Sequence, residues 1–368
     1  MKYCNRCVMP NTKPGVFVDA EGVCSACRSV EQKKFINWEA RRQELVALCD
    51  SIKKANKACY DVIVPVSGGK DSTFQTWMMK EICGMNVLCV CLAPHLPTEE
   101  GIHNLNNMVE SLQVDLIKVN LKPGTLRRLR RKAFIRLGEP NWTEHCAVFA
   151  AVANVALIYD VPLILWGEDV AVEFGGRTTK IRKADARDIH ENDLVRGKSI
   201  LDFVDDEIKE EDVFFYKYPP LAELERKGIQ SVYLSYYHNW DGKKHYELAQ
   251  DYGLWPRRAG PLSGNVIDYD NIDEKLCEIN IWLKYIKFGF WRPTDQCCYQ
   301  IWNGRMTRKE AIRIVNELSD EFPKEYFQDF LDYHELSEKE FWEVVEKFRN
   351  HDIWEKIRGK WQLKVPLT

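Results

Sequence analysis

The sequence has little excess charge of either sign and no long apolar run at its start. Its 52 basic and 55 acidic residues give a formal net charge of −3, so the composition does not demand a polyanionic partner. The first ten residues, MKYCNRCVMP, lack the apolar core of a signal peptide, and the chain shows no convincing internal repeat or low-complexity tract. We therefore expect a cytoplasmic protein, and its thirteen cysteines do not suggest a secreted disulfide scaffold.

A nearly apolar segment, residues 147–166, has about the length of a membrane span. Asp160 and Pro162 divide it, so we interpret it as a buried helix followed by a buried strand. With 368 residues and 45% hydrophobic content, the chain is long enough for two domains with substantial cores. The expectation is a soluble α/β protein without a membrane span.

Strand and helix patterns alternate from residue 59 onward. This alternation predicts an α/β fold with a doubly wound parallel sheet, which binds ligands at the carboxyl ends of its strands. Beyond about residue 177 the strand signals become sparse, and the rest of the chain is expected to be mainly helical. The expected strands are 61–66, 86–92, 114–119 and 162–166, and the expected helices are 71–83, 99–112, 125–137 and 143–159.

The segment SGGKDS lies on the turn between the first expected strand and the helix after it. Gly68 and Gly69 let backbone N–H groups approach a ligand closely, Ser67 and Ser72 add hydroxyl groups, and the helix start supplies partial positive charge. The spacing differs from that of the Walker loop. The turn therefore predicts an anion cradle for phosphate, with a tight turn between core elements as the alternative.

This turn resembles the pyrophosphate loop of the PP-loop ATP pyrophosphatases, which split ATP into AMP and pyrophosphate while adenylating a carbonyl oxygen. The resemblance implies ATP and Mg²⁺ as cofactors. It also implies that backbone groups at the end of the second strand, around Leu92 and Ala93, contact adenine. The residues expected to hold the β and γ phosphates are Ser67, Gly68, Gly69, Lys70, Asp71 and Ser72.

Two CxxC pairs near the start of the chain predict a structural metal site. Cys4, Cys7, Cys24 and Cys27 have the spacing C-x2-C-x16-C-x2-C, which lets four thiolates converge tetrahedrally on zinc. Four protein ligands fill the coordination shell, so the metal is expected to be structural. An iron–sulfur cluster on the same ligands, or four unligated thiols, are the alternatives.

Carboxylates follow the expected strand 162–166. Glu168, Asp169 and Glu173 either position magnesium and accept a proton from an attacking amine, or form a solvated loop and a helix cap. Cys146 begins the apolar helix before this strand. It is either a thiol made reactive by the helix dipole, as sulfur transfer requires, or a small core residue.

Two other segments concentrate basic residues. LRRLRRK, residues 126–132, is either a solvated helix face or a contact to a sugar nucleotide's diphosphate or to RNA. Residues 284–315 combine charged side chains with glycines and aromatic residues, which either bind a substrate or exchange surface salt bridges. The polar candidates in this second segment are Lys284, Lys287, Arg292, Asp295, Gln296, Arg305 and Arg308.

Together these motifs resemble the bacterial N-acetyl sugar amidotransferases, PP-loop enzymes of lipopolysaccharide O-antigen and nonulosonic acid pathways. The similarity covers almost the whole chain. Asp169 stands where the family pattern leads us to expect Asn, and Cys297 and Cys298 stand where we expect small residues. The segments that carry the resemblance are the paired CxxC, SGGKDS, WGED, YLSYYHNWD, KYIKFGFWRPTDQ, NGRMTRKEA and DIWEKIRGKWQLK.

The resemblance implies that AMP is transferred to the acetamido oxygen of a nucleotide-linked N-acetyl sugar and that ammonia then leaves an acetamidino group. A separate glutaminase, similar to the subunits of imidazole glycerol phosphate synthase, is implied as the ammonia source, because the chain shows no persuasive glutaminase domain. The oligomeric state is left open, with a homo-oligomer as one possibility. The implied catalytic residues are Lys70, Asp71, Glu168 and Asp295, and the implied substrate residues are Glu173, Lys287, Arg292, Gln296 and Arg305.

Two other functions compete with this interpretation. A tRNA thiolation enzyme of the PP-loop type would use Cys146 or the pair Cys297 and Cys298, although the acidic balance and the lack of a recognisable RNA-binding appendage disfavour it. A zinc-ribbon adaptor would bind ATP without releasing pyrophosphate. For any of them the expected units are a four-cysteine motif at 1–30, a helical connector at 31–58, an ATP-binding α/β domain at 59–215 and a mainly helical substrate or partner region at 216–368.

Overall fold

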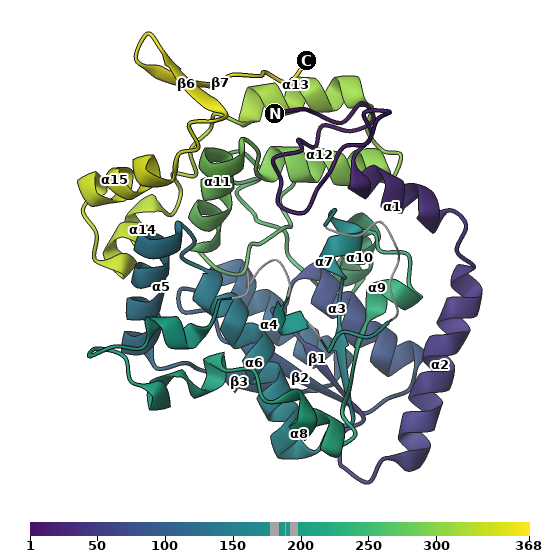
Figure 1. Cartoon of the computed structure of the whole chain (residues 1–368). Helices are drawn as coiled ribbons and strands as arrows, with labels where there is room; N and C mark the ends of the chain where they lie inside the picture. The colour runs from purple at the N-terminus through teal and green to yellow at the C-terminus, as the bar shows by residue number, and fades with distance from the viewer. Residues whose placement is uncertain (177–183, 188, 192–197) are drawn as a thin grey trace.

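The computed structural model describes residues 1–176, 184–187, 189–191 and 198–368 (Figure 1). Within these residues the central element is a five-stranded parallel sheet with the strand order β3-β2-β1-β4-β5. The order reverses between β1 and β4, and the loops that follow these two strands flank the switch point where such sheets bind ligands. The strands are β1 (Val62–Pro65), β2 (Val87–Leu92), β3 (Asp115–Val119), β4 (Leu163–Trp166) and β5 (Gln230–Tyr233).

Helices cover both faces of the sheet, which explains why its central strands are almost continuously apolar. Val62 and Val64 point into a core with α2, α3 and α4, whereas Ile63 points into a second core with α5 and α6. These helices are α2 (Trp38–Ala55), α3 (Lys70–Trp77) with its π-helical extension Met78–Ile82, α4 (Glu99–Leu112), α5 (Pro123–Leu137) and α6 (Trp142–Tyr159).

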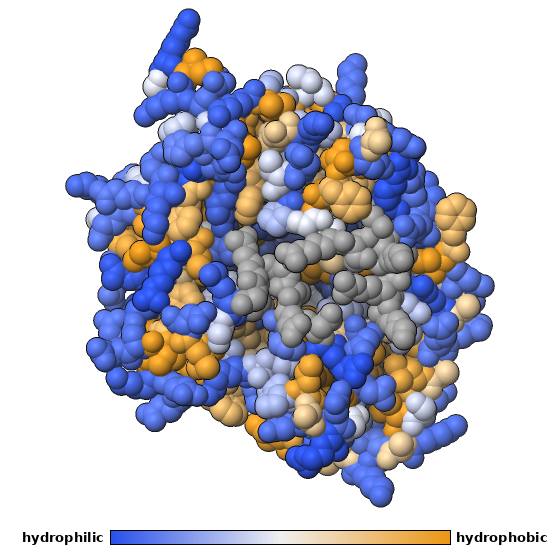
Figure 2. All heavy atoms as spheres, in the orientation of Figure 1, coloured by the Kyte–Doolittle hydropathy of each residue, from blue (hydrophilic) through white to orange (hydrophobic). Residues whose placement is uncertain are grey.

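Helix α6 has the length and hydropathy of a membrane span, but 67% of its apolar window is buried inside the molecule. It packs on the sheet and on the 3₁₀ segment Glu210–Tyr216. On the face drawn in Figure 2, hydrophilic residues predominate and apolar side chains form separate patches. The apolar character of α6 is therefore that of a core helix, as the sequence predicted.

The predicted doubly wound sheet is confirmed, and its first four strands lie where they were expected. The fifth strand, β5, was not predicted. It has four residues, and it follows the helix α8 (Leu221–Arg226) in a region where the strand signals are sparse. Because a strand this short contains a single apolar alternation, its sequence pattern cannot be distinguished from that of a helix end.

The rest of the chain after β5 is mainly helical, as predicted, and it ends in a short antiparallel hairpin that was not predicted. Aromatic side chains, among them Trp282, Phe330 and Phe341, fill its core. The elements are α9 (Leu234–Tyr237), α10 (Gly242–Asp251), α11 (Cys277–Phe288), α12 (Arg292–Trp302), α13 (Arg308–Leu318), α14 (Phe327–His334), α15 (Glu338–Phe348), β6 (Trp354–Ile357) and β7 (Lys360–Leu363).

The two ends of the chain pack together. The N-terminal segment and α1 (Ser25–Lys33) lie against α12 and α13 (Figure 1), and the four N-terminal cysteines share a core with Cys297 and Cys298. The remaining short elements are α7 (Val170–Glu173) after β4 and the 3₁₀ turns Ile189–Glu191 and Ile200–Phe203.

Candidate active site

The segment SGGKDS forms the turn between β1 and α3 and is shaped to hold an anion. Gly68 has a φ of +86°, and a Cβ on it would lie 2.5 Å from the backbone nitrogen of Leu105, so only glycine fits. Gly69 is the N-cap of α3 and offers no side chain to the N–H groups of its first turn. These features fit the phosphates of a nucleotide at the positive end of the helix.

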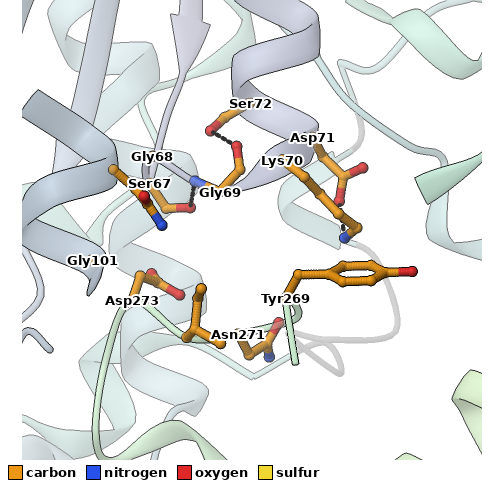
Figure 3. Close-up of a pocket in the computed structure, with 12 residues that line it drawn as sticks. Ser67, Gly68, Gly69, Lys70, Asp71, Ser72, Gly101, Tyr269, Asn271 and Asp273 are labelled. Carbon is orange, nitrogen blue, oxygen red and sulfur yellow. Dashed lines mark hydrogen bonds and ion pairs between the residues drawn. The ribbon is translucent and has the colours of Figure 1, made fainter. Parts of the chain in front are cut away.

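A pocket opens between this loop and a second segment far away in the sequence (Figure 3). The second segment, residues 269–273, was not among the predicted site residues, although its run of acidic and amide side chains is visible in YDNID. The lining residues are Ser67, Gly68, Gly69, Lys70, Asp71, Ser72, Gly101, Asn104, Tyr269, Asn271, Ile272 and Asp273.

Contacts with the start of α4 hold the second segment in place. The Thr98 N–H donates to the Asp273 carbonyl at 3.1 Å, and a Cβ on Gly101 would lie 2.5 Å from the same oxygen. Burial raises the pKa of Asp273 to about 6. The segment therefore presents a half-buried carboxyl group to the phosphate loop from a rigid position.

Lys70 and Asp71 lie at the centre of a charged cluster. The Lys70 Nζ is 2.8 Å from Asp71 Oδ2 and 2.6 Å from Asp270 Oδ1, and the other Asp71 oxygen accepts a hydrogen bond from His245 at 2.7 Å. Burial alone would raise the pKa of Asp71, but the charge of Lys70 and the hydrogen bond from His245 outweigh it and hold this pKa well below its usual range. The carboxylate oxygens of Asp71 fit a divalent cation that accompanies the phosphates.

Glu168 interacts electrostatically with this cluster, whereas Glu173 pairs with α1. Burial, and then the negative charge of Asp71, raise the pKa of Glu168 to about 8. Asp169 caps α7 by accepting the Ala171 N–H at 3.0 Å. Glu173 is buried against Lys33 of α1 in an ion pair, and burial raises its pKa to about 7. The capping alternative thus describes Asp169, and Glu168 interacts electrostatically with Asp71 and Lys70 of the glycine turn.

Helix α12 brings three of the predicted residues together. Gln296 accepts the Val266 N–H at 2.6 Å and donates to Asp270 at 3.5 Å. Arg292 pairs with Glu278 at 3.3 Å, and Asp295 pairs with Lys13 of the N-terminal segment at 3.2 Å. Asp270 therefore connects Lys70 of the phosphate loop to Gln296 at the predicted substrate side.

The other predicted substrate and adenine residues make contacts within the protein. Lys287 pairs with Glu139 at 2.5 Å and donates to the Gly138 carbonyl. Arg305 forms two hydrogen bonds, of 2.8 and 2.9 Å, with Asp241. At the end of β2, after Leu92, the Ala93 N–H donates to the Val119 carbonyl at 3.0 Å. That N–H therefore belongs to the sheet and not to the expected adenine contact.

The basic run 126–132 is partly neutralised by ion pairs within the protein. Arg130 is completely buried and pairs with Glu144 at 2.5 Å and with Glu274 at 2.8 Å. Lys132 pairs with Asp205 and Arg127 with Glu335. These ion pairs occupy three of the five cations of the run, and the exposed Arg128 is not among them.

The four N-terminal cysteines converge as their spacing predicts. Their Sγ atoms all lie within 4.8 Å of one another and are buried, a donor set that fits a tetrahedral metal ion. Trp302 donates from Nε1 to Cys27 Sγ at 3.3 Å, and Arg308 donates to the Cys4 and Cys7 carbonyls at 3.2 Å each. Residues of the C-terminal region thus hold the predicted metal site in place.

The other cysteines raised by the sequence are core residues. Burial raises the pKa of Cys146 to about 12, the opposite of what a reactive thiolate requires. Burial also raises the pKa of Cys297 to about 12. Of the two interpretations of Cys146, the structure supports that of a small buried residue.

Comparison with known families matches residues 263–366 to the family described as "LPS biosynthesis protein WbpG-like, C-terminal domain". An uncharacterized protein of Methanocaldococcus jannaschii, MJ1599, is 30% identical over 118 residues, which cover 32% of this chain and 42% of the relative. The matched region is thus less than half of the relative's length. The first match supports the family that the sequence resembles, and this chain carries a WbpG-like C-terminal domain.

Three solved structures show weaker likenesses. The NH3-dependent NAD synthetase of Campylobacter jejuni has a TM-score of 0.29 at 12% identity over 50% of this chain and 99% of that chain. The NMN synthetase of Francisella tularensis has a TM-score of 0.30 at 14% identity, over 58% of this chain and 96% of that chain. The U34-tRNA thiolase NcsA of Methanococcus maripaludis has a TM-score of 0.33 at 12% identity, over 83% of this chain and 87% of that chain. Likenesses of this size carry no argument, and the fold assignment rests on the order and direction of the strands.

Proposed function

Because residues 263–366 form a WbpG-like domain that contacts the phosphate loop, we propose that the protein is an ATP-dependent amidotransferase of surface polysaccharide biosynthesis. It converts the acetamido group of a nucleotide-linked N-acetyl sugar into an acetamidino group, on the way to lipopolysaccharide O-antigen. The observation that carries the proposal is the chain of contacts from Lys70 through Asp270 to Gln296, which joins the ATP side of the pocket to the family domain.

The reaction needs activation because an acetamido carbonyl is a poor electrophile. Transfer of AMP to its oxygen releases pyrophosphate and creates a leaving group. Attack of ammonia on the same carbon then expels AMP, so that nitrogen replaces oxygen and ATP is consumed as AMP and pyrophosphate. The enzyme must therefore hold the triphosphate, the acetamido group and ammonia in one place.

The phosphate loop holds the β and γ phosphates in this proposal. The N–H groups at the start of α3, the hydroxyl of Ser67 and Lys70 offer donors and positive charge to the departing pyrophosphate, whereas the Ser72 hydroxyl donates to the Gly69 carbonyl at 3.0 Å. Asp71 would hold Mg²⁺, which supplies charge neutralisation of the phosphates when bound.

Glu168 is the proposed proton acceptor for ammonia. A carboxyl group with a pKa of about 8 exchanges protons readily near neutral pH, as a general base requires. Asp295 is proposed as a second carboxylate on the acceptor side, with Lys13 as its partner. Arg292 and Gln296 of α12 are proposed to bind the acceptor sugar, with Gln296 in contact with Asp270 and Arg292 paired with Glu278.

The proposal includes a separate partner and a metal. Ammonia comes from a glutaminase subunit, and the protein works in the cytoplasm. The four N-terminal cysteines hold a structural zinc ion, for which their converging thiols are suited. The ion stabilises the contact between the N-terminal segment and α12 and α13 and takes no part in the reaction.

Mass spectrometry tests the proposal. The protein is incubated with ATP, Mg²⁺, ammonium and UDP-linked diacetamido sugars, and pyrophosphate is followed in parallel. We expect one sugar to show the mass change of replacing O by NH, with sugar-dependent pyrophosphate release that Lys70→Ala abolishes and the exposed control Lys244→Ala retains. If bulk tRNA triggers pyrophosphate release and no sugar does, the thiolation alternative replaces the proposal.

A further inference from the structure

His245 is a fully buried histidine beside the phosphate loop, and the proposed reaction assigns it no role. It lies on α10, stacked on Phe74 of α3 at a centroid distance of 4.1 Å and in edge contact with Trp240 at 4.5 Å. These aromatic neighbours fix the plane of the imidazole ring. A histidine held this firmly next to an ion-binding loop can determine the geometry of what it contacts.

The contact it makes is with Asp71. The distance from Nδ1 to Asp71 Oδ1 is 2.7 Å, and because a carboxylate oxygen accepts hydrogen bonds, Nδ1 is the donor. Nε2 is buried without a hydrogen-bond partner among the described residues. The contact with Asp71 therefore uses Nδ1 alone, and Nε2 takes no part in it.

Two donors therefore fix the Asp71 carboxylate from opposite ends. His245 binds Oδ1, and Lys70 binds Oδ2 at 2.8 Å. A carboxylate has about four acceptor positions, so each oxygen keeps one that is not taken by these donors. The lysine is also shared with Asp270 and would move toward a phosphate, whereas the histidine cannot leave its aromatic slot.

The sequence builds this contact through the start of α10. A Cβ on Gly242 would lie 3.0 Å from Lys70 Cε, so glycine allows the helix to approach the phosphate loop closely. Asp241 caps the helix by accepting the Lys243 N–H at 3.1 Å, and Arg305 holds the same carboxylate. The position of His245 is thus set from the C-terminal region.

We propose that His245 is a positioning residue that fixes the Asp71 carboxylate for the divalent cation of the bound nucleotide. The inference rests on the proposed ATP-dependent function. It concerns the cation and not the acceptor. Hydrogen-bonded partners of metal-binding side chains typically contribute tenfold or more to metal affinity.

Three substitutions separate positioning from packing. His245→Phe keeps the aromatic ring between Phe74 and Trp240 but removes the donor. His245→Asn places an amide N–H near the position of Nδ1, and His245→Gln places it near Nε2, away from Asp71. His238→Phe is the matched control, because His238 contacts Phe74 and the His245 ring in the same aromatic cluster.

Binding of ATP is measured by calorimetry with Mg²⁺ and with EDTA, alongside Tm and the KM for Mg²⁺. We expect His245→Phe and His245→Gln to weaken binding of Mg²⁺–ATP about tenfold, with much smaller changes in EDTA, and His245→Asn to restore most of the loss. Equal losses with and without Mg²⁺, or no loss in a folded variant, overturn the inference. If His245→Phe does not fold, the difference between the Asn and Gln variants decides. If the unmodified protein does not bind Mg²⁺–ATP, the proposed function itself fails.

Discussion

Lys70 of the phosphate loop forms an ion pair with Asp270, 200 residues later in the chain, with Nζ and Oδ1 2.6 Å apart. Asp270 belongs to the WbpG-like region, and its other oxygen lies 3.5 Å from Gln296 Nε2. Gln296 in turn donates to Asn265, which donates to Glu278, the partner of Arg292. A phosphate that draws Lys70 away from Asp270 therefore perturbs a network that reaches the predicted acceptor residues.

The first prediction concerns Asp270. Asp270→Asn removes a negative charge that faces the triphosphate, so the KM for ATP should fall. The substitution also removes the ion pair that couples Lys70 to α12. Sugar-dependent pyrophosphate release should therefore decrease about tenfold, because a hydrogen bond to a charged group is worth about 1.5 kcal/mol and about 1.4 kcal/mol corresponds to a factor of ten. Steady-state kinetics with each substrate varied measures both effects. Asp268→Asn, in the same segment, is the control, and an equal effect of both variants would contradict the coupling role.

The second prediction concerns Glu168. As a base it must be ionised, and its pKa of about 8 means that the rate should rise with pH until about 8. Glu168→Gln should lower kcat by 10²-fold or more, since general base catalysis contributes roughly 10²–10⁴-fold, and should remove this limb of the pH profile. The profile is measured at saturating ammonia, because ammonia also deprotonates with rising pH. A Gln variant that retains the limb would show that another group is the base.

The third prediction concerns stability in acid. Burial lowers the pKa of His334 to about 3, so the folded state cannot take up the proton that the unfolded chain binds below about 6.5. The free energy of unfolding is therefore not reduced by this group above pH 6.5, and it decreases as the pH falls from 6.5 toward 3. At pH 5 the loss is about 2 kcal/mol, from 1.5 pH units at about 1.4 kcal/mol each. Urea unfolding of His334→Phe should therefore show a smaller difference between pH 7 and pH 5, whereas the exposed His351→Gln should behave like the unmodified protein.

The fourth prediction concerns the four cysteines. Replacement of Cys24 by Ser should reduce the bound metal, measured by elemental analysis, and lower the Tm. Because Trp302 and Arg308 contact this unit from the C-terminal region, the loss should also expose hydrophobic surface around α12 and α13. Replacement of the exposed Cys59 should leave metal content and Tm unchanged. An iron content in place of zinc would change the identity of the metal and leave the structural role intact.

The fifth prediction separates amidation from thiolation. Cys146 is buried in the core, where its thiol remains protonated at neutral pH. Cys146→Ala should therefore leave pyrophosphate release within about twofold of the original, with a stability loss of about 1 kcal/mol for a small cavity. A collapse of activity in a folded variant would point to sulfur transfer.

The elements predicted correctly are those whose signals are local. A buried strand, a glycine turn and a helix start follow one another within residues 61–83, and each CxxC pair closes within four residues. Such patterns need no knowledge of the rest of the fold. For this reason the sheet, the glycine turn after β1 and the convergence of the cysteines could be predicted from the sequence alone, and the binding of phosphate by this turn stays a prediction.

The partners of the phosphate loop could not be predicted in this way. Asp71 meets His245, and Lys70 meets Asp270, across more than 170 residues, and neither partner stands in a motif with a recognised spacing. Lys287 and Arg305 were predicted to bind substrate from the charged, aromatic-rich character of their segment and its family resemblance. Their carboxylate partners, Glu139 and Asp241, are also distant in sequence, so only the fold shows that each cation is paired within the protein.

The position of the four-cysteine unit has a consequence for synthesis of the chain. The segment from Cys4 to Cys27 leaves the ribosome before Trp302 and Arg308, which hold it in place and are made roughly 300 residues later. At 5–20 residues per second this interval lasts about 15–60 s. During that time the nascent thiols lack their docking surface and are open to oxidants. Early capture of a metal ion would protect them, so zinc supply during translation should govern the yield of correctly folded protein.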